Sequence, residues 1–120
     1  MKMKTKVINK LLRLLYPFVS NRIRILILRK SGVTVGRDVV ITAHTKISSK
    51  LGYEYLLSIG DRAAIGADHL ILTSDPSNSN LLKYKDKYPF IEVFGKIEIK
   101  NDAWIGAGAI ILPDVVIGEC

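Results

Sequence analysis

Aliphatic residues recur at every sixth position along most of this chain. With Tyr53 as the one exception, they occupy Val35, Ile41, Ile47, Ile59, Ile65 and Ile71, and then, in a new phase, Val93, Ile99, Ile105, Ile111 and Ile117. About a third of the chain is Ile, Leu or Val, so chance would fill about four of these twelve positions, whereas eleven are filled. A six-residue period is neither a helix period nor a strand alternation. It is typical of a solenoid, in which stacked repeats bury one continuous core.

The net charge of +7 is concentrated at the N-terminus. Residues 1–37 contain ten Lys or Arg and no Asp or Glu, whereas residues 38–120 contain eight basic and eleven acidic residues. The single cysteine, Cys120, excludes an internal disulfide framework and a thiolate zinc cluster, and suits a reducing compartment. No apolar run is long enough to cross a bilayer, and Lys10 and Arg13 interrupt the stretch that a signal peptide would need. We therefore expect a cytoplasmic protein.

Residues 1–32 are expected to form a basic, helical arm. Val7, Ile8, Leu11, Leu12 and Leu15 form an apolar stripe at helical spacing over residues 5–16, and Pro17 ends it. A second apolar and basic segment, 22–30, ends at Ser31-Gly32. Two interpretations remain open: the arm caps the first coil of the solenoid, or it also rests on an anionic membrane at the inner face. No aromatic stacking motif accompanies the charge, so nucleic-acid binding is not expected.

The repeat region is expected to span residues 33–120. Gly36, Gly60, Gly66, Gly106 and Gly118 each follow an aliphatic position, where tight corners favour a residue without a Cβ atom. Residues 72–90 break the period, and Pro76 with neighbouring Asn and Ser residues marks them as a loop. Such a loop either carries function or is a tolerated surface insertion.

The stretch IEIKNDAWIGAGAIILPDVVIGE, residues 97–119, resembles the hexapeptide-repeat acyltransferases. Within that family it is similar to the sugar O-acetyltransferases that modify maltose, galactosides and capsular polysaccharide. The resemblance implies an all-β solenoid, a left-handed parallel β-helix. It also implies a homotrimer, acetyl-CoA as donor, a sugar or polysaccharide precursor as acceptor, and a site between subunits. The basic arm followed by SGVTVGRDVVI is similar to membrane-proximal sugar acetyltransferases of surface polysaccharide pathways.

The resemblance also assigns roles to residues of this chain. Small residues let pantetheine lie along the coils, a role that falls to Gly106, Ala107, Gly108 and Ala109, although tight corners explain them equally well. Trp104, next to Ile105, is expected to point outward and to line the subunit cleft or pack in a trimer. Asn101 could contact acceptor or cofactor. Tyr84 could stack on a pyranose ring or pack its loop onto the body.

The catalytic base is the point at which the chain departs from the family pattern. The family places a histidine in the loop after residue 71, where this chain has Ser74 and Pro76. Only His44 and His69 are present; His44 is expected on the surface, and His69 is either buried and hydrogen-bonded or at the loop mouth. If the chain is active, His69 is the expected base, with Asp75 as a weaker candidate that would need a raised pKa.

One other function stays open, and a further one is not expected. The missing loop histidine and the end at Cys120 favour a truncated or non-catalytic solenoid that acts as a scaffold or partner subunit. A zinc hydratase of related fold would need three histidine ligands, two of them closely spaced, and two histidines 25 residues apart do not provide them. No metal is therefore expected.

Overall fold

The structure is a computed structural model that describes residues 3–48, 52–67, 70–72, 86–87 and 94–119. Two helices come first, α1 (Met3–Leu15) and α2 (Asn21–Ser31), with the 3-10 turn Tyr16–Phe18 between them. Within the described residues ten short strands follow, and a second 3-10 turn, Glu54–Leu56, precedes the fourth. The strands are β1 (Thr34–Val35), β2 (Val40–Ile41), β3 (Lys46–Ser48), β4 (Leu57–Ile59), β5 (Ala64–Ile65), β6 (Leu70–Leu72), β7 (Ile97–Ile99), β8 (Trp104–Ile105), β9 (Ile110–Ile111) and β10 (Val116–Ile117).

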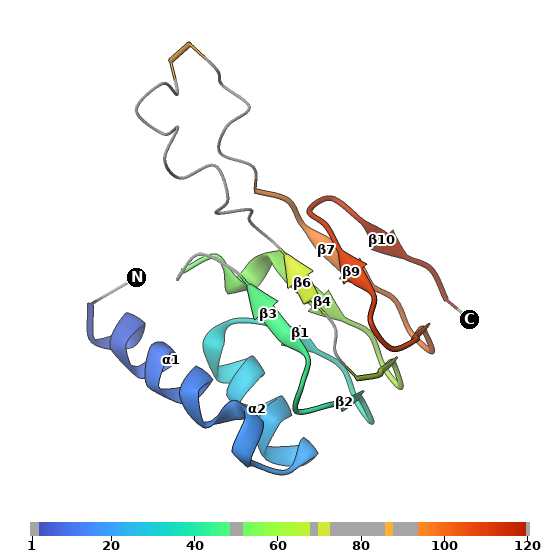
Figure 1. Ribbon diagram of the computed structural model, residues 1–120, viewed down its shortest axis with the longest axis horizontal. Coiled ribbons are helices and arrows are strands. Elements are labelled where there is room, and N and C mark those ends of the chain that lie inside the picture. The colour runs from blue at the N-terminus through green and yellow to red at the C-terminus, as the bar shows by residue number, and fades with distance from the viewer. Residues whose placement is uncertain (1–2, 49–51, 68–69, 73–85, 88–93, 120) are drawn as a thin grey trace.

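The strands form three small parallel sheets, which we call together the sheet stack (Figure 1). Their orders are β1-β4-β7-β10, β2-β5-β8 and β3-β6-β9, so successive strands enter successive sheets and every third strand returns to the same one. Val35 pairs with Ile59, and Ile59 pairs with Ile99. The first spacing is 24 residues and the second is 40, because residues 72–90 lie within the second interval.

The six-residue spacing correctly locates the interior of the sheet stack. Its aliphatic side chains are buried at Ile41, Ile59, Ile65, Ile71, Ile99, Ile105 and Ile111. The small or aliphatic residues two positions earlier are buried at Val33, Val39, Thr45, Ala63 and Ala103. Alternate residues of each short strand therefore face one shared core, and the residues between them face outward.

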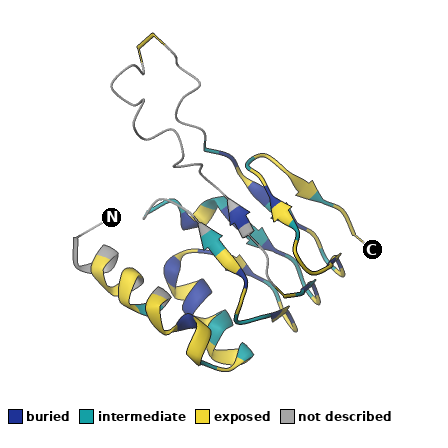
Figure 2. Ribbon diagram, viewed as in Figure 1, coloured by how far each residue is buried: buried dark blue, intermediate teal, exposed yellow. Residues whose placement is uncertain are grey.

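Both helices belong to the same body as the sheets. Ile27 and Leu28 of α2 and Tyr16 are buried in the core that contains Val33 and Val35 (Figure 2). Asn21 ties α2 to β2, because its Nδ2 donates to the carbonyl oxygen of Val39 (3.1 Å) and its Oδ1 accepts from the backbone N–H of Ile41 (2.8 Å). Gly32 ends α2 as expected, with φ of 114°.

The predicted fold class is therefore wrong for this chain. The expected all-β solenoid, a left-handed parallel β-helix, is replaced by a small body in which helices and short strands are packed together. In it α2 contacts β1 and β2, as the interpretation of a capping arm requires, and its buried side chains belong to the same core as the strands. The described structure is instead a mixed α/β fold in which two helices and strands of two or three residues share one interior.

The corners of the sheet stack, by which we mean the short connections between successive strands, approach one another closely. A Cβ atom on Gly36 would lie 2.7 Å from the backbone nitrogen of Asp61, and one on Gly60 would lie 2.5 Å from that of Asn101. The left-handed backbone falls two residues after each of these glycines, at Asp38 and Arg62, with φ of 56° and 59°. These two glycines are thus required by contact between corners and not by a positive φ.

Candidate functional site

The residues assigned to a donor site lie on one stretch, from β8 through the corner that follows it. Trp104 belongs to β8, and Gly106, Ala107, Gly108 and Ala109 form the connection to β9. The assigned catalytic residues His69 and Asp75, and the assigned acceptor residue Tyr84, lie outside the described residues. The structure therefore describes Trp104 and residues 106–109, and the roles assigned to all of these residues stay predictions.

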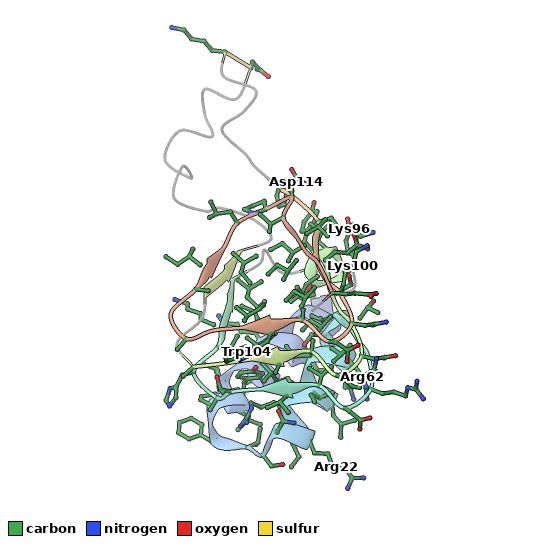
Figure 3. All side chains as sticks on the ribbon, turned by 90° about the vertical axis from the view of Figure 1, so that its right-hand side faces the viewer. Arg22, Arg62, Lys96, Lys100, Trp104 and Asp114 are labelled. Carbon is green, nitrogen blue, oxygen red and sulfur yellow. The ribbon has the colours of Figure 1, made fainter. Side chains whose placement is uncertain are left out.

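Trp104 points outward from the sheet β2-β5-β8, as predicted, and 77% of its surface is exposed (Figure 3). Val40 pairs with Ala64, and Ala64 pairs with Trp104, so the three side chains form a ladder across the outer face of that sheet. Val40 is also exposed. We call these three residues the Trp104 ladder. An apolar surface of this kind on a short sheet is suited to contact with another molecule.

The corner 106–109 is stacked on the preceding corner and open on its outer side. The backbone N–H of Gly108 donates to the carbonyl oxygen of Ala67 (2.9 Å), and that of Gly66 donates to the carbonyl oxygen of Ile105 (3.0 Å). A Cβ atom on Gly106 or Gly108 would meet nothing within 4 Å. Gly108 has φ of 79°, a conformation that glycine adopts without strain. The backbone at Gly106 and Gly108, beside Trp104, is thus not covered by side chains of their own, and an extended ligand can approach it closely. We call this backbone the bare edge.

Asn101, which precedes β8 whereas residues 106–109 follow it, has a structural role. Its Oδ1 accepts a hydrogen bond from the backbone N–H of Asp61 at 2.8 Å, and an Asp61 oxygen accepts from the backbone N–H of Arg37 at 2.8 Å. This backbone contact, followed by the nearby Arg37 charge, lowers the pKa of Asp61. The side-chain oxygens of Asn101 and Asp61 thus each link one corner to the next, and contact of Asn101 with an acceptor would use its amide nitrogen or the second lone pair of Oδ1.

An ion pair between corners was not predicted from the sequence. Arg62 Nε donates to Asp102 Oδ1 at 2.6 Å, and a terminal nitrogen of Arg62 donates to Oδ2 at 2.9 Å. The hydrogen bonds and charge of Arg62 lower the pKa of Asp102. The residues are 40 positions apart, and only the strand register brings them together. Both side chains are about half exposed, so the pair contributes modestly to stability.

A cavity of about 300 Å³ lies between the helices and the first strands. Tyr16, Leu28, His44 and Glu54 are among its lining residues. The Glu54 side chain is buried, and its Oε2 accepts from the backbone N–H of Gly52 at 2.8 Å. Burial raises the pKa of Tyr16 to about 12, and its hydroxyl has no hydrogen-bond partner within the described part of the chain. His44 is exposed, as predicted for a surface residue.

Two features are absent from the described part of the chain. No three His, Cys, Asp or Glu side chains among them lie close enough together to hold a metal ion. No helix in the described ranges is both long and apolar enough to cross a membrane.

Fold and site together define a mixed α/β protein with an open glycine-lined edge beside a surface tryptophan. The chain is 37% identical over 89 residues to a curated protein, "Protein CapG" of Staphylococcus aureus. The matched region covers 73% of this chain and 49% of the relative, so the chain spans about half the length of the curated relative it matches. No protein-family model matches the chain. No solved structure matches it either.

Proposed function

We propose that this chain is an acetyl-CoA-dependent O-acetyltransferase that acts on a sugar hydroxyl in surface polysaccharide biosynthesis. The similarity to Protein CapG supports a role in making capsule polysaccharide. The observation that carries the proposed activity is the bare edge formed by Gly106 and Gly108 beside exposed Trp104. An extended pantetheine arm could lie against such backbone, with the indole packed along one side.

The transfer needs a base, a hydrogen-bond donor for the developing oxyanion, and two substrates held together. Acetyl-CoA would supply the acetyl thioester. The sugar oxygen forms the new ester bond while the carbon–sulfur bond breaks, and the hydroxyl proton passes to the base and then to the departing thiolate. His69 remains the proposed base, with Asp75 as the alternative, and a backbone N–H of the bare edge would face the oxyanion.

The proposed assembly is a homotrimer with the site between subunits. The Trp104 ladder supports it, because three stacked apolar residues on one outer face are costly to leave in water. A second subunit packed near this ladder would close the bare edge into a cleft and exclude water from the thioester.

The test of the donor site is a matched pair of glycine substitutions. Gly106 and Gly118 both follow an aliphatic position, and in both cases an added Cβ atom meets nothing within 4 Å. Gly106→Val should therefore leave the fold intact and obstruct the bare edge, whereas Gly118→Val adds the same side chain at a different corner. Trp104 is the single tryptophan, so its fluorescence reports coenzyme A binding directly.

We expect a saturable change on titration of the unmodified protein and of Gly118→Val, and a titration weakened at least tenfold for Gly106→Val. Release of free thiol in the presence of candidate sugars then measures transfer. A flat trace from the folded, unmodified trimer would contradict the proposal, as would equal weakening by both substitutions.

The second candidate function is a non-catalytic partner subunit. It is favoured by the loop sequence, because residues 73–90 contain no histidine. This candidate predicts no transfer to any sugar and no loss on His69→Ala. Restoration of transfer by Ser74→His would instead indicate a decayed catalytic site that still binds both substrates.

A further inference from the structure

Most of the apolar stripe of α1 faces away from the protein. If the helix only capped the sheet stack, these side chains would be buried, yet among the α1 side chains that the structure describes only Leu12 packs against the core. The exposed apolar side chains of this segment are Val7, Ile8, Leu11, Leu14, Leu15 and Phe18. Leu14 is 64% exposed and Phe18 is 84% exposed. The described structure therefore leaves the stripe without an intramolecular role.

Helix geometry groups these residues on one face. At about 100° per residue, Val7, Ile8, Leu14 and Leu15 lie within about 60° of Leu11. Leu12 lies about 100° round the helix, toward the core that it contacts. Figure 2 shows α1 along the edge of the molecule, and most of its residues whose burial is described are exposed. We call Val7, Ile8, Leu11, Leu14 and Leu15 the α1 face.

The charge around the α1 face has a single sign. Residues 1–37 contain ten Lys or Arg and no acidic residue. Lys10 on α1 and Arg22 on α2 are exposed, and Figure 3 shows Arg22 at the helical end of the molecule. The rest of the chain has more acidic than basic residues. An occupant of the α1 face must therefore be apolar in its interior and negatively charged at its surface.

We infer that α1 lies in the interface of an anionic lipid membrane, with the α1 face inserted among the acyl chains. A cationic helix with a large apolar face binds such a surface through both burial and charge. A second copy of the chain fits less well, because a symmetric contact through α1 would bring two sets of cations together with no acid in either arm. This contact is independent of the proposed transferase activity.

Vesicle flotation tests the inference on the full chain. The vesicles contain phosphatidylcholine with 30% phosphatidylglycerol, and pure phosphatidylcholine vesicles serve as the uncharged comparison. The variant Leu11→Gln/Leu14→Gln keeps good helix formers at exposed positions, so circular dichroism should be unchanged. Val116→Gln, on β10, is the matched control for loss of an exposed aliphatic side chain.

We expect the unmodified protein to float with anionic vesicles, and binding to fall at least about tenfold in the leucine variant but not in Val116→Gln. Lys10→Gln/Arg22→Gln should weaken binding to anionic vesicles only, as should added salt. Absence of binding by the unmodified chain would overturn the inference, and so would equal loss in Val116→Gln. If the leucine substitutions change the sedimenting mass and not flotation, the α1 face is a protein contact. The Trp104 response to coenzyme A, measured on the same samples, reports the donor site separately.

Discussion

Gly60→Ala tests how closely the corners of the sheet stack must approach. In the structure the added Cβ atom would lie 2.5 Å from the backbone nitrogen of Asn101 and 2.6 Å from the backbone carbon of Lys100. Both contacts are with backbone, so a side-chain rotation cannot relieve them. The two corners would have to separate by about 1 Å to restore ordinary contact distances.

That separation weakens two hydrogen bonds that join the corners. The backbone N–H of Gly60 donates to the carbonyl oxygen of Ile99 at 2.6 Å, and that of Asp61 donates to Asn101 Oδ1 at 2.8 Å. Overpacking costs about 1–3 kcal/mol, and each lost hydrogen bond costs about 1 kcal/mol. We therefore expect Gly60→Ala to lower the free energy of unfolding by about 3–5 kcal/mol. At about 4 °C per kcal/mol for a chain of this size, Tm should fall by about 12–20 °C.

Thermal unfolding followed by far-ultraviolet circular dichroism measures this change, and Gly118→Ala is the matched control. An added Cβ atom on Gly118 meets nothing within 4 Å, so its effect should stay within about 0.5 kcal/mol. A loss below about 1 kcal/mol for Gly60→Ala would refute the reasoning, because it would mean that the corners can separate freely.

Three further predictions concern single side chains. Arg62 lowers the pKa of Asp102 below its ordinary 3.8, so the pair stabilises the fold above that pH and its contribution is lost as pH falls through the lowered value. Asp102→Asn, which tolerates the left-handed backbone, should flatten the acid-side fall in Tm; superimposable pH profiles would contradict this. Tyr16→Phe removes a buried hydroxyl that has no partner in the described ranges. The free energy of unfolding measured in urea should therefore stay the same or rise by up to about 1 kcal/mol. A clear fall in this free energy would show that the hydroxyl is hydrogen-bonded. Asn101→Ala leaves the Asp61 N–H without its acceptor and should lower the free energy of unfolding in urea by about 1–2 kcal/mol. An unchanged unfolding midpoint would show that this hydrogen bond does not stabilise the fold.

The six-residue period predicted the buried residues of this fold correctly but predicted the wrong fold class. Ile59, Ile65 and Ile99 are buried because alternate residues of short strands must face the core. Pro17 and Gly32 marked the helix ends through their backbone constraints. The class was wrong because the six-residue period describes the strands alone, whereas helical side chains share their core. Contact of Ile27 and Leu28 with the first strands is a tertiary property.

The site shows the same division between local and long-range information. The outward direction of Trp104 follows from its place next to buried Ile105, so one strand was enough to predict it. The contacts between Asn101 and Asp61 and between Arg62 and Asp102 span 40 residues, and the length of the intervening segment hides their register. The role of Gly60 was likewise predicted as a corner but for an incomplete reason, because the neighbouring corner, and not a positive φ, excludes its Cβ atom.

The two exposed apolar surfaces differ in the kind of partner that each can accept. The Trp104 ladder lies on a sheet and consists of uncharged side chains, so it can be covered by the same surface chemistry on another subunit. The α1 face lies within a segment that has only basic charges, so a like-charged subunit is repelled and an anionic surface is attracted. Figure 1 places α1 at the left of the sheet stack, and Figure 3, viewed from the right, shows Trp104 on β8. The two surfaces therefore call for different partners, so a membrane contact through α1 and a subunit contact through the Trp104 ladder can each be tested without the other.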